Sequence, residues 1–115
     1  MKSLRNSVQL IGNIGQDISF QTFDSGSALA KFSLATSEYY RNNKGEKVQD
    51  TQWHNVIAWG KTAEYINQSL KKGHQVAVKG QIKYNSYESK DGIKRTSCDI
   101  VCNEFIKLTK EEAAF

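Results

Sequence analysis

The sequence contains no proline, only two cysteines and two histidines, and no long apolar run among its 115 residues. Without proline, the turns must rely on glycine, asparagine and aspartate. A membrane-spanning helix needs about 20 predominantly apolar residues, so none is expected here. The first residues also lack the apolar segment of a secretory signal, and we therefore expect a cytoplasmic protein that has no membrane partner.

The few cysteines and histidines give no support for a disulfide, a metal site or a cofactor. Cys98 and Cys102 lie four positions apart in a predicted strand, which separates them by about 13 Å and exceeds the reach of a disulfide. His54 and His74 do not have the spacing of metal ligands. Buried, reduced thiols are the better interpretation, and we predict no metal and no cofactor.

Motifs of the common enzyme classes are also absent. The chain has no G-x-x-x-x-G-K-[ST] phosphate loop, no H-E-x-x-H zinc motif and no nucleophile elbow. Residues 12–15 have the G-x-x-G form of an RNA-binding KH loop, but they follow a predicted strand and open no helix. The sequence therefore predicts that the protein is not an enzyme.

Apolar and polar residues alternate along much of the chain, which is typical of β-strands. Five strands are predicted, at residues 8–13, 28–40, 51–59, 74–87 and 93–108. A break is expected near Asn103 in the last of them. One helix is expected at residues 61–72, ended by Gly73, because an apolar stripe runs along it at helical spacing (Ala63, Ile66 and Leu70).

This order of elements predicts the fold class. A single helix between the third and fourth of five antiparallel strands indicates an all-β OB-fold, a five-stranded Greek-key barrel. Barrels of this class commonly bind oligonucleotides across strands two and three and the adjoining loops. We assign residues 1–108 to this domain and residues 109–115 to a short C-terminal extension.

Two tryptophans lie in the third predicted strand. Trp53 and Trp59 are six residues apart, so they point to the same face of the strand. Val56 and Ala58 on the other face are small enough for the interior of a tight barrel, which would leave both indoles exposed for stacking on unpaired bases. The alternative is that the indoles fill the core, and Ile57 on the tryptophan side supports it.

Tyrosines and basic residues gather near the predicted loops. Tyr39 and Tyr40 end the second strand, and Tyr87 ends the fourth. Tyr84 has the opposite parity, so Tyr87 faces outwards if Tyr84 is in the core. The net charge is +4, and residues 79–95 contain five basic side chains against two acidic ones. Rings for bases and cations for phosphates are what a single strand requires, although charge alone fits a solvated hairpin equally well.

Four stretches of the chain are characteristic of a known family. They are NSVQLIGNIGQD at 6–17, FSLATSE at 32–38, TQWHNVIAWGKTAE at 51–64 and LKKGHQVAVKGQI at 70–82. In this order and spacing, the chain resembles bacterial single-stranded DNA-binding proteins of the tetrameric replication type over about residues 6–108. The resemblance implies a homotetramer that binds and protects single-stranded DNA, independently of sequence, in replication, recombination and repair.

The resemblance also implies roles for individual residues. The base-stacking positions of the family correspond to Tyr40, Trp53, Trp59 and Tyr87, and members commonly have tryptophan at the two tyrosine positions. The phosphate contacts of the family correspond to Arg5, Lys61, Lys72, Lys83 and Arg95. The subunit interface corresponds to Val8 and Leu10, on an edge strand through which subunits pair, and to His54, which has a structural role.

The sequence departs from the family pattern in three places. Ile18 stands where proline is usual, which changes a turn. Asn85 and Ser86 stand where members are often basic, which predicts weaker phosphate contacts there. The long tail with an acidic tip, through which the family recruits replication and repair proteins, is missing. The ending 111–115 is better explained as a helical or frayed terminus, so we do not expect recruitment through a tail.

Two other functions are compatible with these features. An OB-fold accessory module of the primosomal type would bind partner proteins and nucleic acid. The missing tail favours that module, whereas Trp53, Trp59 and the edge strand favour a full strand binder. Binding of single-stranded RNA is also compatible, because stacking tolerates either sugar and no feature of the sequence reads a 2′-hydroxyl. The sequence also leaves open whether the assembly is a dimer or a tetramer.

Overall fold

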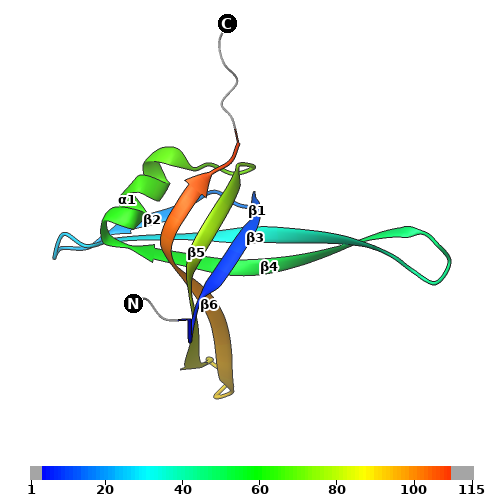
Figure 1. Cartoon of the computed structure of the whole chain (residues 1–115). Coiled ribbons are helices and arrows are strands. Elements are labelled where there is room, and N and C mark those ends of the chain that lie inside the picture. The colour runs from blue at the N-terminus through cyan, green and yellow to red at the C-terminus, as the bar shows by residue number, and fades with distance from the viewer. Residues whose placement is uncertain (1–3, 110–115) are drawn as a thin grey trace, which may run out of the picture.

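The chain folds into six strands and one helix within residues 4–109, the part that the computed structural model describes (Figure 1). The elements are β1 (Val8–Ile14), β2 (Ser19–Thr22), β3 (Ala28–Arg41), β4 (Lys47–Trp59), α1 (Gly60–Ser69), β5 (Gln75–Glu88) and β6 (Lys94–Lys107). The strands pair in the order β1-β5-β6-β4-β3-β2, and β1 also pairs with β3, which closes a barrel. The predicted OB-fold is confirmed.

The short strand β2 was not predicted from the sequence. It has four residues, of which only Phe20 is half-buried, so it is too short to show a periodic pattern. β2 pairs with the beginning of β3 and widens the sheet on the side away from β4. The helix therefore follows the fourth observed strand, which is the third of the five predicted ones.

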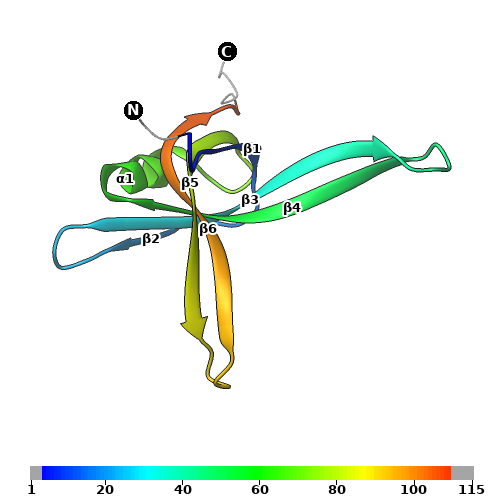
Figure 2. The same cartoon turned by 60° about the horizontal axis from the view of Figure 1, so that its bottom comes forward.

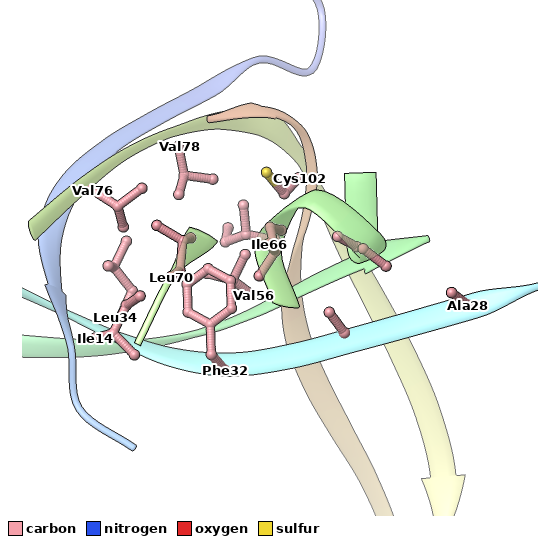
Figure 3. Packing of buried hydrophobic residues seen from close by; sticks show 14 residues of the cluster. Ile14, Ala28, Phe32, Leu34, Val56, Ile66, Leu70, Val76, Val78 and Cys102 are labelled. Carbon is pink, nitrogen blue, oxygen red and sulfur yellow. The ribbon is translucent and has the colours of Figure 1, made fainter. Parts of the chain in front are cut away.

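The core of the molecule lies inside the barrel and comes from alternate positions of the strands (Figure 3). Burial of each large aliphatic side chain here contributes about 1.5–3 kcal/mol, which fixes the face that each strand turns inwards. The helix α1 covers one end of this core with its predicted apolar stripe. The buried side chains include Ala30, Phe32 and Leu34 of β3, Val56 and Ala58 of β4, Ala63 and Ile66 of α1, Leu70, Val76 and Val78 of β5, and Ile100 and Cys102 of β6.

A β-bulge allows β5 and β6 to curve around the barrel. Lys79 pairs with Glu104 and Gly80 pairs with Cys102, so Asn103 is an extra residue on β6. A Cβ on Gly80 would lie 2.8 Å from the carbonyl carbon of Val101, so only glycine fits where the two strands approach. The break that the sequence predicted near Asn103 is therefore a bulge within a continuous strand.

Two hairpins extend beyond the barrel and point in different directions (Figure 1, Figure 2). The β3–β4 arm stays paired as far as Arg41 and Lys47, and the β5–β6 arm as far as Glu88 and Lys94. Residues 47–50, expected in a loop, belong to β4 instead. The periodic signal fails there because an arm without a buried side needs no alternation of apolar and polar residues.

The same geometry corrects two predictions of burial. The alternation along β5 suggested that Tyr84 is in the core, but Tyr84 is 68% exposed because β5 has already left the barrel. Both cysteines are free, as predicted, but Cys98 on the same arm is exposed and only Cys102 is buried. Burial raises the pKa of the Cys102 thiol to about 11, which keeps it protonated and unreactive at neutral pH.

The helix ends earlier than predicted. It stops at Ser69, because Leu70 already has an extended backbone that turns its side chain into the core. The basic residues at 71 and 72 therefore lie in the following turn rather than in the last turn of the helix, and Gly73 serves that turn with a φ of 90°.

The described residues also bear on membrane and metal binding. Within residues 4–109, no helix is long and apolar enough to cross a membrane. In the same part of the chain, no three His, Cys, Asp or Glu side chains are grouped to hold a metal ion. Apart from Thr109, the predicted C-terminal extension lies outside the described residues.

Candidate nucleic-acid interface

One outer surface of the sheet carries both tryptophans. It consists of the odd-numbered residues at 31–39 of β3, 47–59 of β4, 81–87 of β5 and 95–101 of β6, and we call it the tryptophan face. Because Val56 and Ala58 are buried, their odd-numbered neighbours point outwards. Trp53 is 63% exposed and Trp59 is 54% exposed. The predicted exposure of the indoles is confirmed, and the alternative that they fill the core is wrong.

The indole of Trp53 lies against the backbone of Gly15. A Cβ at position 15 would come within 2.6 Å of Trp53 Cη2, which is closer than two unbonded carbon atoms allow. The Gly15 N–H donates a hydrogen bond of 3.0 Å to the Ser33 carbonyl, so this backbone is fixed to β3. Glycine at position 15 therefore provides a firm support for part of the ring and leaves the rest open.

The indole of Trp59 has an aromatic neighbour that the sequence did not indicate. Phe23, in the hairpin between β2 and β3, has its ring centroid 6.3 Å from that of Trp59, and the two ring planes are inclined by 26°. Aromatic pairs of this geometry contribute about 0.5–1.5 kcal/mol beyond their buried area. Phe23 is itself partly exposed. It therefore restrains Trp59 and widens the aromatic surface at this end of the face.

Polar side chains occupy the surface between the two tryptophans. The strand register places Ser33 of β3, Asn55 of β4 and Asp99 of β6 next to one another. These residues line a groove with a volume of about 390 Å³. The tryptophan face thus has aromatic groups at its two ends, and in the middle it has hydrogen-bonding groups together with Ile57 and Lys31.

Asp99 is the most buried of these polar groups. Its side chain lines the groove although the residue is only 9% exposed. The Asn85 amide donates a hydrogen bond of 2.9 Å to Asp99 Oδ2, and the Ser97 hydroxyl donates a longer one of 3.4 Å to the same oxygen. These contacts hold the carboxylate in place, so its orientation is set before any ligand arrives.

The β3–β4 arm places its two tyrosines on opposite faces. Tyr39 and Tyr40 are both exposed, but only Tyr39 has the parity of the tryptophan face. The Lys47 ammonium lies 4.6 Å from the centroid of the Tyr39 ring, which gives an aromatic group and a cation in one contact. Tyr40, the position that the family resemblance indicates, has an accessible ring on the other side of the arm.

The β5–β6 arm combines an aromatic ring with cations. Tyr87 is exposed and pairs directly with Arg95, which is also exposed. Lys83 lies on the same side of β5 and is the register partner of Asp99. The predicted residues Tyr87, Lys83 and Arg95 therefore share the tryptophan face with Trp53 and Trp59.

The other three predicted phosphate contacts are not on this face. Arg5 precedes β1, Lys61 lies in the first turn of α1, and Lys72 lies in the turn that follows the helix. All three side chains are exposed. A nucleic-acid strand that reaches these three side chains has to leave the tryptophan face and continue around the molecule.

The residues predicted at a subunit interface lie in two places. Val8 and Leu10 are half-buried and pack against the core from β1. His54 is partly buried where β4 leaves the barrel, and its Nε2 is 2.9 Å from the Thr36 hydroxyl. That hydrogen bond holds the imidazole on the face opposite to Trp53.

Comparison with known proteins identifies similar chains. The model of the family described as "Single-strand binding protein family" matches residues 5–108. The chain is 44% identical over 103 residues to a single-stranded DNA-binding protein of Neisseria meningitidis, covering 90% of this chain and 59% of that protein. It is 37% identical over 109 residues to single-stranded DNA-binding protein 1 of Chlorobaculum tepidum, covering 94% of this chain and 67% of that protein. The chain thus spans about three-fifths of the length of the curated relatives it matches.

Solved structures of single-stranded DNA-binding proteins are also similar to this chain. A Plasmodium falciparum SSB in complex with ssDNA superposes with a TM-score of 0.85 at 28% identity, covering 95% of this chain and 98% of that one. A deletion mutant of the single-stranded DNA-binding protein from Thermus aquaticus superposes with a TM-score of 0.77 at 25% identity, covering 90% of this chain and 50% of that one.

Proposed function

This chain belongs to the single-strand binding protein family, and on that premise we propose that it binds single-stranded DNA with little dependence on sequence. The observation that carries the proposal is the pair of exposed indoles, Trp53 and Trp59, on one face of the barrel. Stacking of a base on an aromatic side chain is worth about 1–3 kcal/mol and accepts any base, because every base has a π-face.

The remaining aromatic and basic residues extend the path of the strand. Tyr87 and Tyr40 offer further rings on the two arms, while Lys83 and Arg95 offer cations to the phosphates. The exposed side chains of Arg5, Lys61 and Lys72 would contact a strand that continues around the molecule. Coating of a strand in this way removes its hairpins and protects it during replication, recombination and repair.

A titration of the intrinsic tryptophan fluorescence tests the proposal. Oligo(dT) should quench the emission strongly, because stacked bases contact the indoles directly, whereas a duplex of equal length should have little effect. Absence of quenching together with absence of binding to labelled oligo(dT) would overturn the proposal.

Substitution of Trp53 tests whether single-stranded DNA binds at the tryptophan face. Trp53→Ala should weaken binding of labelled oligo(dT), measured by fluorescence anisotropy, by about 1–3 kcal/mol while circular dichroism shows an intact fold. The matched control is Tyr65→Ala, which removes an exposed aromatic ring from α1 and should leave the affinity unchanged. If both variants lose affinity equally, the site lies elsewhere.

We further propose that the protein is a homotetramer, in which subunits pair with one another through β1. Residues 8–13 of β1 pair with β5, but on the other side only Asn13 and Ile14 pair with β3. Within residues 4–109, the outer edge of residues 8–12 therefore has no partner strand, and such edges are readily extended by another chain. Val8, Leu10 and His54 are the residues we assign to subunit contacts.

The remaining features of the proposal follow from the family. The protein acts by binding, without catalysis or cofactor, and the family match supports a strand binder over a primosomal-type accessory module. Competition between matched DNA and RNA oligomers would determine the preferred sugar. The location in the cytoplasm remains a prediction.

A further inference from the structure

We propose that the β3–β4 arm carries a nucleotide site on the tryptophan face, made by Tyr39, Lys47 and Arg41. Tyr39 stacks on a base, and the two cations bind the phosphates next to that base. This inference rests on the proposed binding of single-stranded DNA. It adds a site that the family resemblance does not indicate, because the resemblance points to Tyr40 on the other side of the arm.

The two sides of the arm differ in charge. Arg41 and Lys47 are register partners on the tryptophan face, and none of the odd-numbered positions from 37 to 51 is acidic. On the other side, Glu38 and Asp50 are register partners, and both are exposed on the side that carries Tyr40. A chain of phosphates is therefore attracted to the tryptophan face of the arm and repelled from its other side.

Tyr39 and Lys47 contact each other before any ligand binds. The Lys47 ammonium lies 4.6 Å from the centroid of the Tyr39 ring, and the ring is still 60% exposed. Together with Arg41 and the neighbouring Tyr40, they line a hollow with a volume of about 370 Å³. A base can therefore stack on the Tyr39 ring while the ammonium beside it meets a phosphate of the same strand.

The turn at the end of the arm restrains the second cation. The Arg41 guanidinium donates a hydrogen bond of 3.0 Å to the Gly45 carbonyl. The side-chain oxygen of Asn42 accepts hydrogen bonds from the backbone N–H groups of Lys44 and Glu46, which fixes the turn itself. A guanidinium has five N–H donors, so Arg41 keeps others for a phosphate and loses less side-chain entropy when it binds one.

The surface between Trp53 and Tyr39 lets a strand pass from one ring to the other. Tyr39 is four residues further along β3 than the register partner of Trp53, which corresponds to about 13 Å. The Ser37 hydroxyl, which lies between them, accepts a hydrogen bond of 3.3 Å from the Gln49 amide and is 3.3 Å from the Thr51 hydroxyl. These groups are polar and uncharged, so the phosphates meet no carboxylate on the way.

Two substitutions on β4 place the same charge on the two sides of the arm. Gln49 is the register partner of Tyr39 on the tryptophan face, Gln52 points to the other side, and both are exposed. For an oligo(dT) long enough to reach from Trp59 to the arm, Gln49→Glu should weaken binding about five-fold more than Gln52→Glu, as expected for a like charge at contact distance. Fluorescence anisotropy measures both affinities, and the equal net charge of the two variants cancels long-range effects.

A second set of variants tests the cation. Lys47→Gln should reduce the slope of log affinity against log salt concentration by about 0.7, the value for one phosphate contact. Lys47→Arg keeps the charge and the contact with the ring, so it should retain the wild-type slope. The control is Lys94→Gln, which removes an exposed cation from the β5–β6 arm on the side away from the tryptophan face and should leave the slope unchanged.

The outcomes separate this inference from the proposed function. Equal effects of Gln49→Glu and Gln52→Glu, or an unchanged slope for Lys47→Gln, would overturn the site on the arm and leave strand binding intact. Short oligo(dT) that covers only the region from Trp53 to Trp59 should bind all these variants about as tightly as the wild-type protein, which also shows that they are folded. Failure of the wild-type protein to bind oligo(dT) of any length would overturn both proposals.

Discussion

Phe23 determines the shape of the tryptophan face at one end, although it lies in the hairpin between β2 and β3 and not on a strand that carries the predicted site. Its near-parallel packing on Trp59 restricts the rotamers of the indole and places a second ring beside it. Gly15 has a related effect on Trp53, because its lack of a side chain leaves the position that the indole occupies. Each tryptophan is thus oriented by a residue from a segment far away in the sequence.

Phe23→Ala should weaken binding of oligo(dT) by about 2- to 12-fold, which corresponds to the loss of one aromatic pair. Phe23→Leu retains the bulk without the ring and should give an intermediate loss. Fluorescence anisotropy measures the affinity, and a double-mutant cycle with Trp59→Ala shows whether Phe23 acts through the indole. If Phe23→Ala costs as much affinity when Trp59 is already alanine, Phe23 contacts the DNA independently and does not position Trp59.

The β3–β4 arm extends the tryptophan face beyond the barrel as a two-stranded ribbon. Because successive side chains of a strand alternate between faces, Tyr39 continues the side of Trp53, whereas Tyr40 lies on the other side of the arm. A DNA strand that follows the tryptophan face therefore meets Tyr39 first, and it reaches Tyr40 only after it crosses the β3–β4 arm.

Because Tyr39 and Tyr40 lie on opposite sides of the β3–β4 arm, we expect the loss of affinity on substitution of each tyrosine to depend on the length of the oligonucleotide. Tyr39→Ala should weaken binding at shorter lengths of oligo(dT) than Tyr40→Ala, with a loss of about 1–3 kcal/mol per affected base in each case. Neither substitution should affect oligomers that cover only the region from Trp53 to Trp59. Isothermal titration with a series of lengths provides the measurement, and a Tyr39→Ala protein with unchanged affinity at every length would place the strand off this side of the arm.

At the scale of the whole molecule, aromatic and basic groups are distributed differently. The indoles are concentrated on the tryptophan face, whereas the predicted phosphate contacts are spread from the segment before β1 to the β5–β6 arm. Stacking is insensitive to salt, while each neutralised phosphate releases counterions and makes the affinity depend on salt. The two contributions can therefore be measured separately.

Arg95→Ala should reduce the slope of log affinity against log salt concentration by about 0.7, the value for one phosphate contact on a single strand. Trp53→Ala should lower the affinity at every salt concentration and leave the slope unchanged. Titrations of labelled oligo(dT) at several salt concentrations give both quantities. Identical slopes for the wild-type and Arg95→Ala proteins would remove Arg95 from the phosphate contacts.

The amino-acid sequence by itself determined the barrel strands, the single helix and the outward direction of Trp53 and Trp59. These features depend on local alternation, because small apolar residues such as Val56 and Ala58 must turn inwards and their neighbours must turn outwards. The motifs along β1, β3 and β4 likewise indicate the family from the sequence alone.

Only the tertiary structure decided where the strands leave the barrel and which distant groups meet. Tyr84 and Cys98 keep the parity of core residues, yet they are exposed because the barrel has ended where they lie. Phe23 against Trp59 and Asp99 beside Asn55 depend on pairings between segments far apart in the chain. Alternation along a strand records the side to which a residue points, but what lies on that side is set by the packing of the whole chain.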